Sequence, residues 1–238
     1  MGTASRPPMD HHHRDVQAGG ARAAVFGISD GLVTNVSLIL GVAGAHPAGT
    51  VVRLTGLAGM VAGAFSMAAG EYVSMQAQRE LLQRELEVER QALRHDPETE
   101  QRELAAIYVD RGVEPAMARE LAGRMMRDPE VALETHAREE LGISPSRLGS
   151  PLQAAASSFV TFALGALLPL LPWLVTSGTA AVLATVVVGA VASLAVGAVL
   201  GAFTGRSVAR SAGRQLLLAA MAAAVTYGIG RLVGASGA

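Results

Sequence analysis

Five long apolar stretches, divided into a pair and a triplet by a charged segment, dominate the pattern of this chain. They run over residues 23–45, 54–75, 152–175, 179–204 and 215–233. Each holds about 20 residues, which is the length that a helix needs to cross a hydrocarbon core of about 30 Å. The pattern therefore predicts five membrane-spanning helices.

The charged segment between the second and third stretches predicts further helices. It contains 16 of the 20 acidic residues and 11 of the 19 basic ones, with apolar residues recurring at helical spacing. Asp96–Glu98 and Asp128–Glu130 each read Asp-Pro-Glu, a typical helix start, and Gly112 and Gly142 suit helix ends. We predict helices over 76–94, 97–111, 115–127 and 129–141, the first continuing the second membrane span without a break.

The predicted fold is an all-α membrane protein with five transmembrane helices and a cytoplasmic helical domain inserted between spans two and three. Its parts are a disordered tail (1–22), spans one and two (23–77), the helical domain (78–147) and spans three to five (148–238). Arginines concentrate in the tail and between spans four and five, which by the positive-inside rule makes the N-terminus and the helical domain cytoplasmic and the C-terminus external. We expect a multi-pass protein of the cell inner membrane or plasma membrane.

Composition limits the chemistry that is open to the chain. There is no cysteine, so disulfides, thiolate metal sites and cysteine nucleophiles are excluded. Metal ligands must come from carboxylates, histidine, methionine or backbone oxygens. The run His11–His13 is interpreted as part of the disordered tail, with a weak metal-collecting tail as the alternative. We expect no permanently bound cofactor and no nucleic-acid partner.

A stripe of small residues in the fourth span allows another helix to approach closely. Its members recur at every fourth position: Gly189, Ser193, Gly197, Gly201 and Gly205. Packing inside one bundle is the favoured interpretation, and a contact between subunits is the alternative.

Asp30 and Glu71 are the only carboxylates in the apolar spans. A charged side chain near the centre of a bilayer costs roughly 2.5–3.5 kcal/mol on insertion scales, and such residues usually line a path or bind a cation. The pair therefore predicts movement of a cation or a proton. The alternatives are an interhelical hydrogen bond for Asp30 and a position at the headgroup level for Glu71.

Both residues belong to stripes at helical spacing. The first span carries Asp30, Thr34, Ser37 and Gly41 on one face, and the second carries Gly63, Met67, Glu71 and Met75. A thioether beside carboxylates favours softer transition metals over Mg²⁺ or Ca²⁺. Methionine in a helix more often only fills space in the apolar packing. We predict a transport pathway formed by Asp30, Thr34, Gly63, Met67 and Glu71.

The chain resembles the vacuolar iron transporter family from about residue 21 to its end. The resemblance rests on five stretches in combination: Ser29–Asn35, Ser66–Ser74, Asp96–Glu100, Glu140–Ile143 and Leu168–Pro172. It implies a homodimer with a pore at the subunit interface, moving Fe²⁺ out of the cytosol in exchange for protons. The family's pore aspartate falls on Asp30 and its pore methionine on Met67, while Glu71 falls in a Gly-Glu-Tyr variant of the second span.

The resemblance also implies metal ligands in the helical domain. Glu100 and Glu103, which share a helix face, and Glu140 match the family's glutamates. On the helix that leaves the membrane, Glu85 and Glu89 are the expected ligands, with Glu80 and Glu87 as substitutes. His136 stands where plant members carry a methionine pair, and an imidazole binds Fe²⁺, Zn²⁺ and Mn²⁺ alike.

The leading hypothesis is a secondary transporter, not an enzyme, whose substrate is Fe²⁺, with Mn²⁺ or Zn²⁺ as alternatives. Its other partners would be protons, the lipid bilayer and a second copy of the chain. The alternative is a membrane-anchored iron-binding protein or ferroxidase. Di-iron bundles use Glu-x-x-His pairs, and this spacing does not occur in the chain, which argues against oxidase chemistry.

Overall fold

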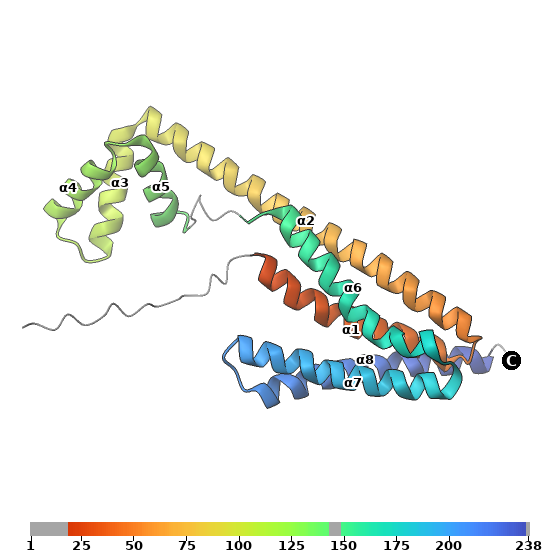
Figure 1. Cartoon of the computed structure of the whole chain (residues 1–238). Helices are drawn as coiled ribbons and strands as arrows, with labels where there is room; N and C mark the ends of the chain where they lie inside the picture. Colours follow the sequence, from red (N-terminus) through yellow and green to blue (C-terminus); the bar gives the residue numbers. More distant parts are fainter. Residues whose placement is uncertain (1–18, 143–148, 237–238) are drawn as a thin grey trace, which may run out of the picture.

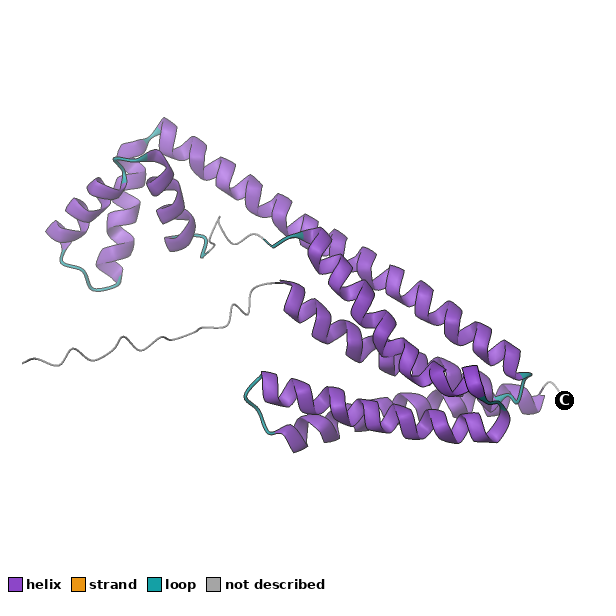
Figure 2. Cartoon of the chain, viewed as in Figure 1, coloured by secondary structure: helices purple, strands orange, loops and turns teal. Residues whose placement is uncertain are grey.

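The computed structural model describes residues 19–142 and 149–236, which form eight α-helices without a β-strand among them (Figures 1 and 2). Five of the helices are long and apolar enough to span a membrane, as predicted. They are α1 (Gly19–Gly44), α2 (Gly49–His95), α6 (Pro151–Val175), α7 (Gly178–Phe203) and α8 (Val208–Ser236).

The boundaries of three membrane helices differ from prediction at their starts. Helix α1 begins at Gly19 instead of residue 23, α2 at Gly49 instead of residue 54, and α8 at Val208 instead of residue 215. The rest of the predicted N-terminal tail, with the His11–His13 run, lies outside the described residues.

Helix α2 is a single helix of 47 residues. At 1.5 Å per residue it is about 70 Å long, roughly twice the thickness of a hydrocarbon core. Figure 1 shows it running from the membrane bundle to α3 and α5 at its far end. The prediction that the second span continues unbroken into a polar helix is confirmed.

Helices α1 and α6 form the centre of the bundle. In the most apolar 18-residue segment of each of these helices, 44% is buried inside the protein, compared with 17% in α2 and 11% in α8. The two backbones touch at glycines, because a methyl group on Gly31 would overlap the carbonyl oxygen of Phe162, and one on Gly165 would overlap that of Ile28. Only glycine, which has no side chain, allows the two helix backbones to approach this closely.

Polar side chains fix the neighbours of α6. The buried amide of Asn35 in α1 donates to the carbonyl oxygen of Ala166 at 2.6 Å. The hydroxyl of Thr185 in α7 donates to the carbonyl oxygen of Pro169 at 3.1 Å. These bonds cross between helices where the medium offers no water, so they specify how the helices pack.

The small-residue stripe of α7 packs inside the bundle, as the favoured interpretation predicted. A methyl group on Gly197 would lie 2.7 Å from the Cα of Ala212 in α8, and one on Gly189 would lie 3.0 Å from a methyl of Val36 in α1. Gly205 lies beyond the end of α7, in the turn, with a positive φ of 65°.

Helices α3 (Pro97–Asp110), α4 (Pro115–Met125) and α5 (Pro129–Glu139) lie between α2 and α6 in the chain and form a small block. The predicted caps are present. The Asp96 carboxylate accepts a hydrogen bond from the backbone N–H of Thr99, and the Asp128 carboxylate accepts from the backbone N–H groups of Glu130 and Val131. Leu104, Ala105, Ala118 and Ala122 form the core between α3 and α4.

The block is anchored to α2 through α5. Leu86 of α2 packs with Leu133 and Ala137 of α5 in a cluster of their own. An ion pair between Arg111 and Glu139 ties the end of α3 to the end of α5. The polar half of α2 thus packs against one side of the block, at α5.

The close contact of α1 and α6 makes a testable prediction. Replacing Gly31 with Ala forces the two helices apart and should lower the free energy of unfolding by about 1–3 kcal/mol, the usual cost of overpacking. Thermal unfolding of the purified protein measures this. Gly213→Ala is the matched control, because nothing lies within 4 Å of a methyl group there; equal melting of the two variants would contradict the contact.

Candidate metal site and membrane pathway

Acidic and imidazole side chains converge where α2, α3 and α5 meet. Glu89 comes from the far half of α2, Glu100 and Glu103 from one face of α3, and His136 and Glu140 from the end of α5. The packing of Leu86 against α5 places Glu89, one turn further along α2, beside His136. The site is therefore built by the same contacts that anchor the block.

These five residues form two overlapping groups. In the first, one ligand atom each from Glu89, Glu100 and His136 lie within 4.8 Å of one another; in the second, the same holds for Glu100, Glu103 and Glu140. Ligands on opposite sides of a transition-metal ion, each at about 2.1 Å, are about 4.2 Å apart. Either group therefore needs only a small contraction to bind a divalent cation, and Glu100 belongs to both.

His136 is completely buried and is held in the orientation of a metal ligand. Its Nδ1 lies 2.9 Å from the carbonyl oxygen of Ala132, one turn back on α5. When Nδ1–H donates to that oxygen, Nε2 carries the free lone pair. Nε2 is 3.3 Å from the carbonyl oxygen of Glu100, an atom that cannot donate. A ring nitrogen that donates to a backbone carbonyl is typical of metal-binding histidines, and a metal ion at Nε2 would replace its contact with the Glu100 carbonyl.

The carboxylates of the site are destabilised in their charged form. Burial, reinforced by the charge of Glu140, raises the pKa of Glu89. Burial and the neighbouring Glu103 raise the pKa of Glu100, and burial also raises the pKa of Glu140. Glu89 is 9% exposed, and its Oε1 has no hydrogen-bond partner among the described residues. A cation bound here would relieve both the repulsion and the missing hydrogen bond.

The other predicted ligands of α2 lie outside both groups. Glu85 is half-buried one turn before Glu89 and takes no part in either. Of the two substitutes, Glu80 accepts a hydrogen bond from Gln76, and Glu87 forms an exposed ion pair with Arg90. Glu89 is therefore the candidate glutamate of α2 that lies beside the ligands of α3 and α5.

The polar stripe of α1 faces out of the bundle at Thr34, which is exposed, and Asp30 is half-buried beside it. The Thr34 hydroxyl donates to the Asp30 carboxylate at 3.3 Å. Ser37, further along the stripe, is buried, and its backbone carbonyl accepts from Thr226 of α8 at 2.8 Å. The half of the stripe that contains Asp30 is the half left open.

The stripe of α2 lies against α6 in part. Met67 packs onto the cluster of Ala64, Phe162 and Ala166, and a methyl group on Gly63 would overlap the ring of Phe162. Helices α1 and α2 both pack chiefly on α6 and touch each other less. Glu71 and Met75, further along the stripe, are half-buried.

Two positioning residues were not assigned a role from the sequence. Gln215 of α8 is buried, and its amide donates to the Ser29 hydroxyl at 2.7 Å, one residue from Asp30. Asn35 holds the next turn of α1 to α6, as described above. A lone amide among apolar residues was the available signal for both, but periodicity does not identify the partner of such an amide.

Comparison with known proteins gives a consistent result over nearly the whole chain. A model described as the VIT family matches residues 21–231. Vacuolar iron transporter 1 of Arabidopsis thaliana is 31% identical over 228 residues, which are 94% of this chain and 91% of the relative. The vacuolar iron transporter of Acanthamoeba castellanii is 37% identical over 223 residues, covering 90% of this chain and 79% of the relative.

Removing the shared ligand should weaken metal binding most. Glu100→Gln keeps the size of the side chain but removes a ligand charge from both groups, so we expect the affinity for Mn²⁺ or Co²⁺ to fall at least about tenfold. Isothermal titration of the full chain measures this. Glu120→Gln is the control, since Glu120 is exposed on α4 and pairs with Arg124; equal loss in both variants would contradict the site.

The raised pKa values also set a pH dependence. Carboxyls whose pKa is raised in the folded state contribute stability at low pH that is lost as the pH rises through the folded-state pKa. Without metal, α5 should therefore exchange its amide hydrogens faster at about pH 7 than near pH 4.5, the ordinary pKa of glutamate, after correction for intrinsic rates. Glu89→Gln should reduce this difference; an unchanged difference in that variant would exclude Glu89 as a source.

Proposed function

This chain belongs to the VIT family, a family of metal-ion transporters and not of enzymes, and we propose that it carries Fe²⁺ out of the cytosol in exchange for protons. Mn²⁺ and Zn²⁺ are further candidate substrates, because the donor set of the α3–α5 block is not exclusive to iron. The alternative of a membrane-anchored ferroxidase is set aside, since the family and its named relatives are transporters.

The α3–α5 block would collect the ion. Four carboxylates with an imidazole suit a divalent transition metal, and they stand at the far end of the helix that carries Met67 and Glu71. The turn between α7 and α8, which contains Arg206, lies at the end of the bundle nearest the block (Figure 1). The positive-inside rule then favours a cytosolic position for the block.

Asp30 would carry the transport step. It is the carboxylate of α1, and Thr34 donates to it without adding charge. Its oxygens can hold either a proton or a metal ion at one time, and metal binding displaces the proton. Alternation between the two states couples outward movement of the metal to inward movement of protons. This lone carboxylate in an apolar span is the observation on which the proposal rests.

A second copy of the chain would complete the pathway. Thr34 is exposed and Asp30 half-buried on a face that the protomer's own helices leave open. In hydrocarbon such a face is costly, and a partner presenting the same face would enclose it. A two-fold axis along α1 brings the two Asp30 side chains to one path, with Met67 and Glu71 contributing from α2. The functional unit would be a homodimer in the plasma membrane.

Transport by proteoliposomes tests the proposal. With a pH gradient and an Fe²⁺-sensitive dye on the receiving side, Asp30→Asn should lower the initial rate to that of empty vesicles, because an amide cannot exchange a proton for a metal ion. Metal binding by the block should persist in this variant. Asp110→Asn, an exposed position at the end of α3, should transport normally.

Two outcomes would overturn this account. Wild-type rates in Asp30→Asn would remove the residue from the pathway. An Fe²⁺ flux that is unaffected when an ionophore collapses the pH gradient would remove the coupling to protons.

A further inference from the structure

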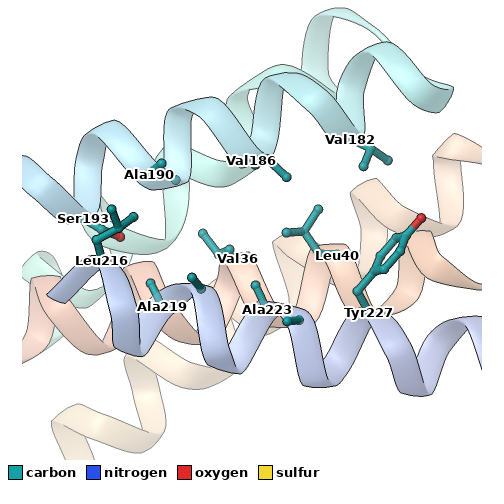
Figure 3. A pocket seen from close by; sticks show the side chains of 13 residues that line it. Val36, Leu40, Val182, Val186, Ala190, Ser193, Leu216, Ala219, Ala223 and Tyr227 are labelled. Carbon is teal, nitrogen blue, oxygen red and sulfur yellow. The ribbon is translucent and has the colours of Figure 1, made fainter. Parts of the chain in front are cut away.

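The membrane bundle contains an apolar cavity of about 350 Å³ between α7 and α8 (Figure 3). Val36 and Leu40 of α1 form its floor, and Tyr227 lies at one end. No charged side chain of the described residues lines this cavity, so its chemistry identifies no ligand. The helical block contains a contact with a definite chemical neighbour, because the ends of α3 and α5 meet next to the candidate metal ligand Glu140.

An ion pair between Arg111 and Glu139 joins these two helix ends. Arg111 follows the last residue of α3, and Glu139 is the last residue of α5, 28 residues further along the chain. The pair Glu134–Arg138 of α5, by contrast, joins two residues one turn apart on one helix. The side chain of Glu139 is 23% exposed, half the value of Glu134 at 46%. The pair between the helices is therefore better shielded from water, and shielded ion pairs are screened less by salt.

Arg111 also reaches the backbone directly before Glu140. Its Nη2 lies 3.5 Å from the carbonyl oxygen of Glu139, which belongs to the peptide group between Glu139 and Glu140. The N–H of the same peptide group donates to the carbonyl oxygen of His136 at 2.8 Å, as the C-cap of α5. Leu141, the next residue, is 38% exposed, and helix ends tend to fray. Arg111 thus supplies a contact from outside the helix at the turn where α5 ends.

This turn carries a ligand whose partners stand on the other helix. Glu140 is exposed, and one of its carboxylate oxygens lies within 4.8 Å of ligand atoms of Glu100 and Glu103, both on α3. Arg111 belongs to the end of α3 as well. One arginine therefore connects the helix that carries two ligands to the peptide group that precedes the third. Contacts that orient a ligand in this way raise the affinity of a metal site.

The charge of Arg111 by itself is unfavourable for such a role. A guanidinium is permanently charged and repels a cation that is bound nearby. The Glu139 carboxylate accepts from the guanidinium and offsets its charge, so Arg111 can hold α5 without opposing the negative charge of the ligands. Positioning and electrostatics consequently predict opposite effects when the arginine alone is replaced. Loss of positioning weakens metal binding, whereas loss of a positive charge strengthens it.

We propose that Arg111 is a positioning residue of the metal site, which holds the last turn of α5 against the end of α3 and so keeps Glu140 beside the ligands of α3. Arg111 does not touch the ion and acts through Glu140. Neither residue of the ion pair belongs to the two ligand groups. The role assigned to Arg111 rests on the proposed function, in which the block collects the transported ion.

Isothermal titration of the full chain with Mn²⁺ tests the proposal. Arg111→Gln should weaken binding at least about threefold, the scale of a partly exposed ion pair, although it removes a positive charge. Arg138→Gln is the matched control, because it removes the same charge from a pair that lies within α5. This control should bind Mn²⁺ at least as tightly as the wild type. Unchanged or tighter binding by Arg111→Gln would overturn the proposal.

A double-mutant cycle distinguishes positioning of Glu140 from a general effect on the fold. When the ligand is already removed in Glu140→Gln, the additional change Arg111→Gln should cause no further loss of affinity. In the Glu89→Gln background the same change should weaken binding as much as in the wild type. An equal loss in both backgrounds would assign Arg111 to the stability of the block alone, which would contradict the proposal.

A conservative variant provides a second route to the same answer. Arg111→Lys keeps the charge but lacks the guanidinium fork, so its affinity should lie between those of the wild type and Arg111→Gln, and it remains informative if Arg111→Gln does not fold. Wild-type affinity in both variants would exclude the role of Arg111 and leave the collecting role of the block intact. A wild type that binds no Mn²⁺ would instead contradict the collecting role, and the role of Arg111 with it.

Discussion

The backbone contact between α1 and α6 determines where every other part of the bundle lies. At Gly31 and Gly165 the two helices meet without intervening side chains, and hydrogen bonds from Asn35 and Thr185 then hold α1 and α7 to α6. Because α2 also packs on α6, the faces of α1 and α2 that carry Asp30 and Met67 are oriented by the same central helix. The close contact fills the protomer's centre, and the part of α1 that carries Asp30 and Thr34 lies at its surface.

Helix α2 joins the two chemically distinct parts of the molecule without a flexible connection. Glu71 and Glu89 are 18 residues apart on one helix, which corresponds to about 27 Å. The length of the helix therefore fixes how far the α3–α5 block stands from the bundle, and α5 holds the block against α2 through Leu133 and Ala137. Under the proposed function, an ion released from the block would have to cross this distance to reach Glu71.

Local structure was predictable from the sequence, whereas the choice among equivalent side chains was not. The Asp96 and Asp128 caps, the unbroken α2 and the bundle-internal stripe of α7 follow from short-range rules of spacing and capping. Glu85 and Glu89 occupy the same face one turn apart, so periodicity does not distinguish them; the docking of α5 against Leu86 does. The partners of Gln215 and Asn35 likewise depend on tertiary packing, which no local pattern encodes.

The sharing of Glu100 between two ligand groups limits how firmly the block can hold an ion. If one ion binds Glu89, Glu100 and His136, a second at Glu103 and Glu140 must compete for the same carboxylate or bridge through its other oxygen. The elevated pKa values of Glu89, Glu100 and Glu140 add competition from protons. Each effect shortens the residence of a bound ion. The proposed role of the block, to gather ions for delivery to the membrane helices, requires such a weak hold, because an ion held too tightly would never leave.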